Sequence, residues 1–310
     1  MFRKVKVAAI SFVPAKWDIE GNANRLEKAF RKAAGKGAEL ALAPEGVLEG
    51  YVVNQIVAEG VPPERMREVA VPIDGAEITR LRSLAAELSM CLVFGFAELI
   101  GEEVFNCAVF IDDKGRIRGK YHKMQLAEGT EESWWFNRLG AKSRAFNTPF
   151  GRCGIMICND RWNPDLARIP VLDGARYLLI PSYGSRKKKQ DRAVLARARE
   201  NGVPIVEANV GVTLIISKGE VVKRSRKEDT ITYGTIEVPV PASPRNRDMH
   251  EGEFLKWRNE EMPKRRRKAE KRRAGIVGSE PSPPRRRRKE EKVRGKRAAT
   301  TRKPLSRALS

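Results

Sequence analysis

Residues 151–162 read "GRCGIMICNDRW", an apolar run that ends at Cys158 and is followed by Asn159, Asp160 and Arg161. A short apolar run bounded by polar residues predicts a buried β-strand. Cys158 would then lie where that strand ends. In open α/β sheets, binding and catalytic groups gather at the carboxyl ends of strands, so Cys158 is a candidate functional residue.

Similar runs on both sides of this stretch alternate with helical patterns. Runs rich in Val and Ile predict strands at residues 4–13, 38–45, 91–99, 176–182, 204–210, 212–217 and 220–225, and a hairpin over residues 104–123. Apolar residues at helical spacing predict helices at 22–37, 77–90 and 190–201, and another that begins near Pro164. Strands interleaved with helices indicate an α/β layered fold.

The end of the chain has a different composition. The 310 residues carry a formal net charge of +22, and residues 261–310 hold 20 Lys and Arg against 5 Asp and Glu. After about Pro239 the regular patterns end, apart from a short helix expected around residues 254–257. Segments rich in Pro, Arg and Lys cannot bury enough apolar surface to fold alone. We expect one domain at residues 1–240, an extension at 241–261 that could pack on a partner subunit, and a disordered Lys/Arg-rich tail at 262–310.

Cys158 taken alone is compatible with several roles. Zinc sites need closely spaced Cys and His ligands, whereas Cys153 and Cys158 are five positions apart and the chain has only two histidines. A cysteine–histidine pair would have to use His122 or His250. A complete dinucleotide fingerprint and a P-loop are both absent from the sequence. A buried structural thiol, and a thiol activated by groups other than histidine, both remain open.

Two further acid–base residues occupy the same kind of position as Cys158. Glu45 closes the predicted strand "AELALAPE", and Lys123 closes "GRIRGKYHK". Each alone is as well explained as a loop carboxylate or a surface lysine, but the three together form a candidate catalytic group. A carboxylate can take the proton of a thiol, and an ammonium can stabilise the negative charge that develops on oxygen when an amide is attacked.

Around these residues the chain resembles the nitrilase, or carbon–nitrogen hydrolase, superfamily. The segments "APEGVLEGY", "YHKMQL" and "GIMICND" are similar to the three signature segments of that superfamily, in the same order. "RARENGVPIVEANVG" is similar to a later one. The motifs are nearest to those of N-carbamoyl amino acid hydrolases and aliphatic amidases. The resemblance implies an αββα sandwich, outside which the disordered basic tail lies.

The resemblance also implies an activity. Members of the superfamily hydrolyse non-peptide C–N bonds, and we expect a small amide or N-carbamoyl substrate, a cysteine thioester and release of ammonia. Carried over by position, Glu45 is the general base, Lys123 stabilises the tetrahedral intermediate and Cys158 is the nucleophile. A second glutamate of the superfamily matches Glu132 best, within "EGTEESWWF". No metal or organic cofactor is implied, and a homo-oligomer is expected.

One segment departs from the superfamily pattern. Where N-carbamoyl-D-amino-acid hydrolases read C-N-D-R-R-W-P-E, this chain reads C-N-D-R-W-N-P-D from Cys158 to Asp165. Trp162 therefore stands in the place of the second arginine. By this resemblance Asn159, Arg161 and Trp162 are candidate substrate-binding residues, and the substrate stays open between amides, carbamoyl compounds and nitriles.

Composition also bears on the setting of the chain. The four cysteines lack the regular spacing of a disulfide framework. No stretch resembles a secretory signal or reaches the ~20 apolar residues that cross a bilayer. We therefore expect a cytoplasmic protein that does not enter membranes.

Two further expectations concern the tail and the thiols. In an alternative from another class of function, the hydrolase fold is catalytically silent and the basic tail binds nucleic acid or other polyanions non-specifically. For the thiols, we expect Cys158 to be more exposed than Cys91, Cys107 and Cys153, and Lys123 to favour its thiolate form.

Overall fold

The computed structural model describes residues 2–127, 138–241 and 244–277. The chain divides into two compact units, Met1–Ala242 and Ser243–Ser310. Across the described ranges, no helix is both long enough and apolar enough to cross a membrane.

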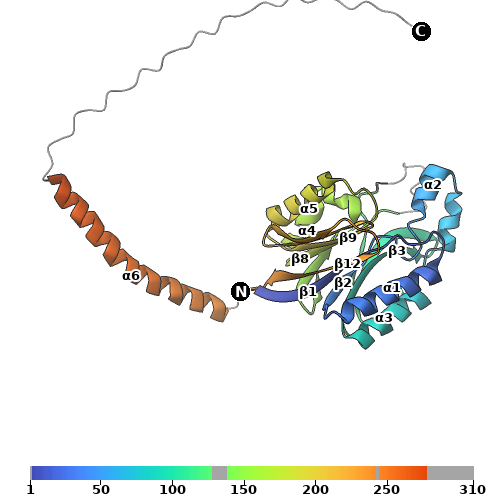
Figure 1. The fold of residues 1–310 in the computed structure, drawn as a ribbon, viewed down its shortest axis with the longest axis horizontal. Coiled ribbons are helices and arrows are strands. Elements are labelled where there is room, and N and C mark those ends of the chain that lie inside the picture. The colour runs from blue at the N-terminus through green and yellow to red at the C-terminus, as the bar shows by residue number, and fades with distance from the viewer. Residues whose placement is uncertain (1, 128–137, 242–243, 278–310) are drawn as a thin grey trace, which may run out of the picture. The chain divides into compact units, whose positions relative to one another are not determined.

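The first unit contains two six-stranded sheets (Figure 1). One has the strand order β12-β1-β2-β3-β4-β5 and consists of β1 (Phe2–Ser11), β2 (Leu40–Leu42), β3 (Cys91–Ile100), β4 (Glu103–Ile111), β5 (Ile117–His122) and β12 (Thr230–Pro239). The other has the order β11-β10-β9-β8-β7-β6 and consists of β6 (Phe146–Thr148), β7 (Gly151–Ile155), β8 (Tyr177–Ser182), β9 (Ile205–Asn209), β10 (Val212–Ser217) and β11 (Glu220–Ser225). The pairs β1–β2, β2–β3, β7–β8 and β8–β9 are parallel and the others antiparallel, so both sheets are mixed.

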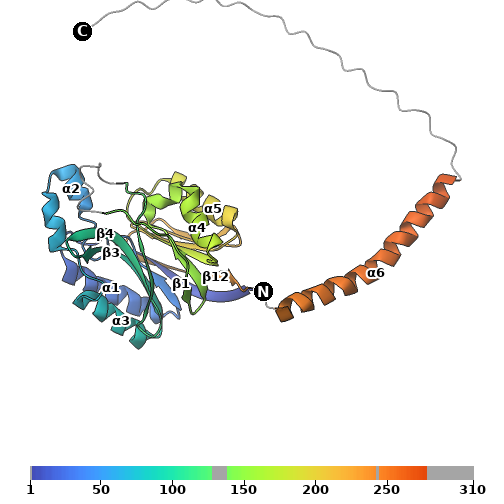
Figure 2. The ribbon, with the colours of Figure 1, turned by 180° about the vertical axis from the view of Figure 1, so that it is seen from behind.

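Helices cover the outer face of each sheet. Figures 1 and 2 show α1 (Ile19–Ala34) and α3 (Ala76–Leu88) on one side of the sandwich, and α4 (Pro164–Leu172) and α5 (Lys188–Asn201) on the other. Buried apolar residues form one cluster between the two sheets and one beneath each helical layer. The predicted αββα architecture is confirmed.

The sequence explains these layers locally. Residues 7–10 of β1 are a continuous apolar run because both faces of the strand are buried there: Val7 and Ala9 face the other sheet, while Ala8 and Ile10 face the helices. Helix α1 buries a stripe of residues at helical spacing, and its first turn is capped by Asp18, which accepts a hydrogen bond from Gly21 N at 2.9 Å.

Several elements of the first unit were not predicted. The predicted strand series ends at residue 225, whereas β12 follows and pairs with β1 over its whole length. Gly234 interrupts its pattern, and its partner strand lies at the other end of the sequence. Helix α2 (Val53–Glu59), the 3-10 helix η1 (Pro63–Glu68) and the short strand β6 were also missed.

In the second unit the structure describes one long helix, α6 (Pro244–Val277). It is far longer than the short helix expected around residues 254–257. The expectation of disorder from residue 262 is corrected for residues 262–277, which are helical. Lys, Arg, Glu and Ala are good helix formers even where they bury nothing. The rest of the predicted tail, residues 278–310, lies outside the described residues.

Candidate active site

The three residues of the candidate catalytic group lie where strands end. Glu45 follows β2 by three positions, Lys123 comes directly after β5, and Cys158 is the first residue of the 3-10 helix η3 (Cys158–Trp162), three positions after β7. All three side chains are buried. Since β2 and β5 belong to one sheet and β7 to the other, the group assembles only when the two sheets pack.

Glu45 and Lys123 are in direct contact. Lys123 Nζ donates to Glu45 Oε1 at 2.8 Å, and neither side chain is exposed to solvent. Asn106 Nδ2, from β4, donates to the same oxygen at 2.8 Å, and Tyr183 N donates to Oε2 at 2.9 Å. These three donors orient the carboxylate. They also compensate for its desolvation, which would be strongly unfavourable for an unpaired buried charge.

Cys158 joins this group through Tyr183. Its thiol donates to the Tyr183 carbonyl oxygen, with Sγ at 3.6 Å, and the amide of the same tyrosine donates to Glu45. The Cys158 backbone has a φ of 45°, in the left-handed region that non-glycine residues rarely adopt. Such strain costs about 1–3 kcal/mol and clusters at functional sites. The fold therefore brings Glu45, Lys123 and Cys158 together, and their catalytic roles remain predictions.

The thiol of Cys158 is protonated near neutral pH. Burial raises the pKa of Cys158 to about 12 and the negative charge of Glu45 acts in the same direction, while Arg161 and Lys123 oppose them. Lys123 therefore favours the thiolate, as expected, but desolvation outweighs both nearby cations and the thiol stays protonated. The order of exposure is as expected, since Cys158 is 7% exposed and the other three cysteines are 0% exposed.

The backbone of Glu45 lies directly against strand β3. A Cβ atom at Gly95 would lie 2.6 Å from Glu45 Cα, so only glycine allows this approach. Gly95 N donates to Pro44 O at 3.0 Å, and Val47 N donates to Gly95 O at 2.9 Å. The segment that carries Glu45 is therefore fixed to β3 by hydrogen bonds on both sides of the carboxylate.

Arg161, expected from the resemblance to bind substrate, is fully buried and contacts protein groups through all three nitrogens. Nε donates to Cys158 O at 2.6 Å, Nη2 donates to Ser182 Oγ at 2.6 Å, and Nη1 forms an ion pair with Glu207. The carbonyl that it holds belongs to the strained residue. This geometry makes Arg161 a positioning residue for the turn at Cys158.

The other two candidate substrate-binding residues lie nearer the surface. Asn159 Nδ2 donates to Leu126 O at 3.4 Å. Trp162 is 37% exposed, and Lys189 Nζ lies 5.1 Å from the centre of its ring. Their role in binding substrate stays a prediction. Glu132, the expected second glutamate, lies outside the described residues.

Asp160 was not predicted as a site residue, although the pattern Cys-x-Asp pointed to it. Its buried carboxylate accepts hydrogen bonds from Gln125 N at 2.9 Å, from Ile157 N at 2.8 Å and from Tyr121 Oη at 2.8 Å. Burial raises the pKa of Asp160 to about 6, although these donors oppose the shift. Asp160 thus ties the chain after Lys123 to the turn at Cys158.

Glu49 is a second carboxyl group missed from the sequence, although it lies in the same segment as Glu45. It is 3% exposed, and its Oε2 accepts from Ala97 N at 3.1 Å. Burial is the main cause that raises the pKa of Glu49 to about 7, and the charge of Glu45 adds to the shift. A cavity of about 10 Å³, the size of one water, lies between Glu49 and Asn106.

Comparison with known proteins identifies the family to which the chain belongs. Residues 6–243 match the carbon-nitrogen hydrolase family. The chain belongs to this family. N-carbamoylputrescine amidase of Arabidopsis thaliana is 30% identical to it over 218 residues, which cover 67% of this chain and 71% of the relative. Citrullinase of Francisella tularensis is 28% identical over 219 residues, covering 66% and 73%.

Solved structures of the same fold agree with the layers described above. Nit3 of Saccharomyces cerevisiae, a member of the nitrilase superfamily, has a TM-score of 0.67 at 21% identity, covering 76% of this chain and 90% of that one. The amidase of Nesterenkonia sp. AN1 has a TM-score of 0.62 at 23% identity, covering 80% and 99%. The protein is a carbon–nitrogen hydrolase that acts on non-peptide C–N bonds.

This carbon–nitrogen hydrolase has one cluster of candidate metal ligands in its described part. The ligand atoms of Glu98, Cys107 and His122 lie within 4.8 Å of one another. Glu98 already bonds His122 through one oxygen and the ammonium of Lys120 through the other. A cation in contact with the carboxylate disfavours a second one, so we assign no metal to this cluster.

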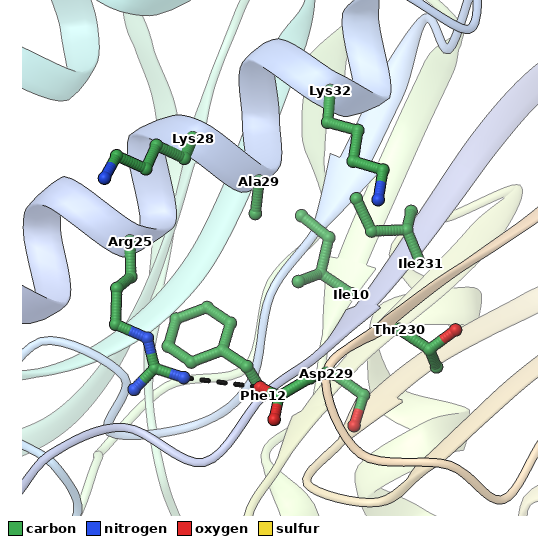
Figure 3. Close-up of a pocket in the computed structure, with 10 residues that line it drawn as sticks. Ile10, Phe12, Arg25, Lys28, Ala29, Lys32, Asp229, Thr230 and Ile231 are labelled. Carbon is green, nitrogen blue, oxygen red and sulfur yellow. Dashed lines mark hydrogen bonds and ion pairs between the residues drawn. The ribbon is translucent and has the colours of Figure 1, made fainter.

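The pocket in Figure 3 lies away from the catalytic group. It has a volume of about 270 Å³, with Ile10, Phe12 and Ile231 among the residues of its apolar lining and Lys28 and Lys32 among its cations. Arg25 Nη2 crosses one end to reach Asp229 Oδ1 at 3.3 Å. None of Glu45, Lys123 and Cys158 lines it. The reaction of the hydrolase is therefore not assigned to this pocket.

Proposed function

We propose that the protein hydrolyses a small compound with a terminal carbamoyl or primary amide group, through a thioester on Cys158, and releases ammonia. The observation that carries this proposal is the contact of both Glu45 and Cys158 with the backbone of Tyr183. This contact holds a carboxylate and a protonated thiol beside each other in a buried site.

The reaction begins with the thiol. Its proton passes to Glu45 as the sulfur attacks the carbonyl carbon, because a thiol with a pKa of about 12 needs a base near neutral pH. The C–S bond forms and the carbonyl oxygen becomes negative. The ammonium of Lys123, buried beside Glu45, stabilises that oxygen in surroundings of low dielectric constant.

The second half of the reaction uses the same carboxyl group. Protonated Glu45 gives its proton to the leaving nitrogen, the C–N bond breaks, and ammonia departs. The acyl group stays on sulfur as a thioester, or as a thiocarbamate when the substrate is an N-carbamoyl compound. Glu45 then takes a proton from water, which attacks the carbonyl carbon. The C–S bond breaks, and Glu45 returns the proton to sulfur to restore the thiol.

The names of the relatives support carbamoyl compounds as the substrate class. N-carbamoylputrescine and citrulline, for which two relatives are named, both end in a carbamoyl group on nitrogen. The replacement of an arginine by Trp162 in the motif of N-carbamoyl-D-amino-acid hydrolases argues against a substrate that needs that arginine. We therefore propose an N-carbamoyl amine or a simple primary amide.

Ammonia release from matched pairs of compounds tests this proposal. Each pair consists of an N-carbamoyl amine and the N-acetyl derivative of the same amine. The acetyl group has a methyl group where the carbamoyl group has the NH2 that would leave as ammonia. Primary amides and nitriles complete the panel. We expect ammonia from carbamoyl compounds or primary amides and none from the acetyl partners. A folded protein that releases no ammonia from any carbamoyl compound or amide would overturn the proposal.

A further inference from the structure

The second half of helix α6 has a concentration of positive charge that the hydrolase reaction does not use. Eight of the ten residues from 264 to 273 are Lys or Arg, against a single glutamate. All ten side chains are exposed. Between residues 248 and 263, by contrast, five Asp and Glu stand against two Lys and Arg. Within residues 248–273, the excess of positive charge therefore lies in one segment, residues 264–273, which we call the basic segment.

Few of these cations are neutralised within the helix. Lys264 pairs with Glu261 at 2.9 Å and Arg266 with Glu270 at 3.7 Å, and all four side chains are accessible to solvent. The other six cations of the basic segment form no ion pair with a carboxylate of any described residue. Exposed pairs of this kind contribute at most about 1 kcal/mol each, so the segment remains free to bind an external polyanion.

The cations surround the helix. Successive residues of an α-helix are about 100° apart, so Lys and Arg at 264–268 and 271–273 occupy every side. Helices that bind membrane surfaces need an apolar face to bury in the lipid, and the basic segment has none. A partner that contacts the helix from more than one side suits this distribution better than a flat surface does.

We propose that the basic segment is a DNA-binding helix that lies in the major groove of duplex DNA and contacts phosphates on both walls. An α-helix with its side chains is about 10–12 Å wide, and the major groove of B-form DNA is about 12 Å wide. The major groove of duplex RNA is too deep and narrow to admit side chains in this way. The contacts go to phosphates, so binding is independent of sequence and strongly dependent on salt.

Two full-length variants with equal loss of charge test the proposal. In one, residues 264–268 (Lys-Arg-Arg-Arg-Lys) are changed to glutamine, and in the other residues 285–289 (Arg-Arg-Arg-Arg-Lys) are changed to glutamine. Glutamine keeps a good helix propensity, and circular dichroism checks that α6 is retained. Binding to a fluorescent duplex DNA is measured by anisotropy between about 50 and about 200 mM salt.

We expect the helix variant to lose at least about tenfold more affinity than the tail variant, and its salt slope to fall by about 4. Equal losses would mean that total charge decides the binding. A larger loss in the tail variant would assign it to the tail. Either result overturns the proposal.

A substitution that keeps the charge tests whether DNA binding needs the helical conformation or only the cations. Ala269→Pro interrupts α6 within the basic segment and changes no charge, and Ala298→Pro is its control outside the described residues. We expect only Ala269→Pro to weaken DNA binding. Unchanged binding in Ala269→Pro contradicts the groove geometry, as does tighter binding of the wild-type protein to duplex RNA or to phosphatidylserine vesicles than to duplex DNA.

Discussion

Cys158 combines a strained backbone with a buried, protonated thiol. Its backbone is held in a strained conformation at the start of η3, while burial keeps the sulfur protonated. If Cys158 is the nucleophile, as we propose, it becomes active only when its proton moves to Glu45. A site of this kind reacts poorly with general thiol reagents at neutral pH and well with a substrate that brings its carbonyl group close to Lys123.

Alkylation of the resting protein measures this protonation directly. Because the rate of iodoacetamide labelling follows the thiolate fraction, labelling of Cys158 should rise about tenfold per pH unit from about pH 7 to about pH 10, without a plateau. Peptide mass spectrometry follows the adduct, and Cys107, which is fully buried, serves as the unreactive control. A plateau below about pH 9 would show that Cys158 is a thiolate in the resting site.

Glu49 should make stability depend on pH. Its pKa is raised from 4.5 to about 7 in the folded protein, so the folded state keeps a proton that the unfolded state loses. Stability therefore falls as the pH rises from about 4.5 through about 7. Glu49→Gln removes this dependence and should stabilise the protein at about pH 8 by up to about 3 kcal/mol relative to the wild type.

Urea unfolding at several pH values checks the Glu49 prediction. Near pH 4 the variant and the wild type should have the same free energy of unfolding, because Glu49 is protonated in the folded wild type. Glu64→Gln, at an exposed position of η1, is the matched control and should leave the pH dependence unchanged. A Glu49→Gln variant that is less stable than the wild type at about pH 8 contradicts the raised pKa.

Strand β3 fixes the segment 43–47, which carries the candidate catalytic residue Glu45. Gly95→Ala would put a methyl group 2.6 Å from Glu45 Cα, so the segment must move. We expect kcat/KM to fall about 100-fold or more, since catalysis is sensitive to displacements near 1 Å. Stability should fall by about 1–3 kcal/mol. Gly35→Ala is the control, because its Cβ would lie at an ordinary 3.5 Å from the nearest atom. Full activity in Gly95→Ala would contradict this account of Glu45.

The candidate catalytic group could be predicted from the sequence because each member closes a predicted strand within a recognisable segment. Glu45, Lys123 and Cys158 are recognisable from their own neighbours in the chain. Asn106 and Tyr183 are not, because they reach Glu45 only through tertiary structure. Asn106 lies beside Lys123 by the register of β4 and β5, where Lys123 N donates to Asn106 O at 2.9 Å. Tyr183 directly follows β8, which belongs to the other sheet.

Two elements escaped prediction for a different physical reason. β12 gains its hydrogen bonds from β1, at the other end of the sequence, and no local pattern carries that pairing. In the part of α6 from residue 262 on, the composition predicted disorder because so little of it is apolar, while the helix propensity of Lys, Arg and Glu favours the helix that the structure has. The low apolar content and the high helix propensity thus predict different structures there, and the structure agrees with the helix propensity.

At the scale of the whole molecule, the reaction and the basic region belong to different units. Every residue of the candidate active site lies within Met1–Ala242, and α6 lies within Ser243–Ser310. The predicted homo-oligomer and the packing of residues 241–261 on a partner subunit stay predictions. This division implies that catalysis does not need the cationic end of the chain.

Deleting residues 262–310 tests that division. We expect kcat on a small amide or carbamoyl compound to stay within about twofold of the full chain, because no candidate catalytic residue is removed. DNA binding should be lost together with the basic segment. The thermal unfolding midpoint of the truncated protein verifies that the first unit is intact. A large loss of turnover with an unchanged midpoint would place part of the active site beyond residue 261.

The role of Cys158 as the nucleophile is tested most directly by ammonia release from one substrate with three proteins: the wild type, Cys158→Ala and Cys107→Ala. Both alanine variants lose one buried thiol, so the comparison separates chemistry from packing. We predict turnover in the wild type, near-normal turnover in Cys107→Ala, and a loss of at least about 1,000-fold in Cys158→Ala, as expected when a covalent nucleophile is removed. Ammonia release by folded Cys158→Ala at a rate close to that of the wild type would contradict the account.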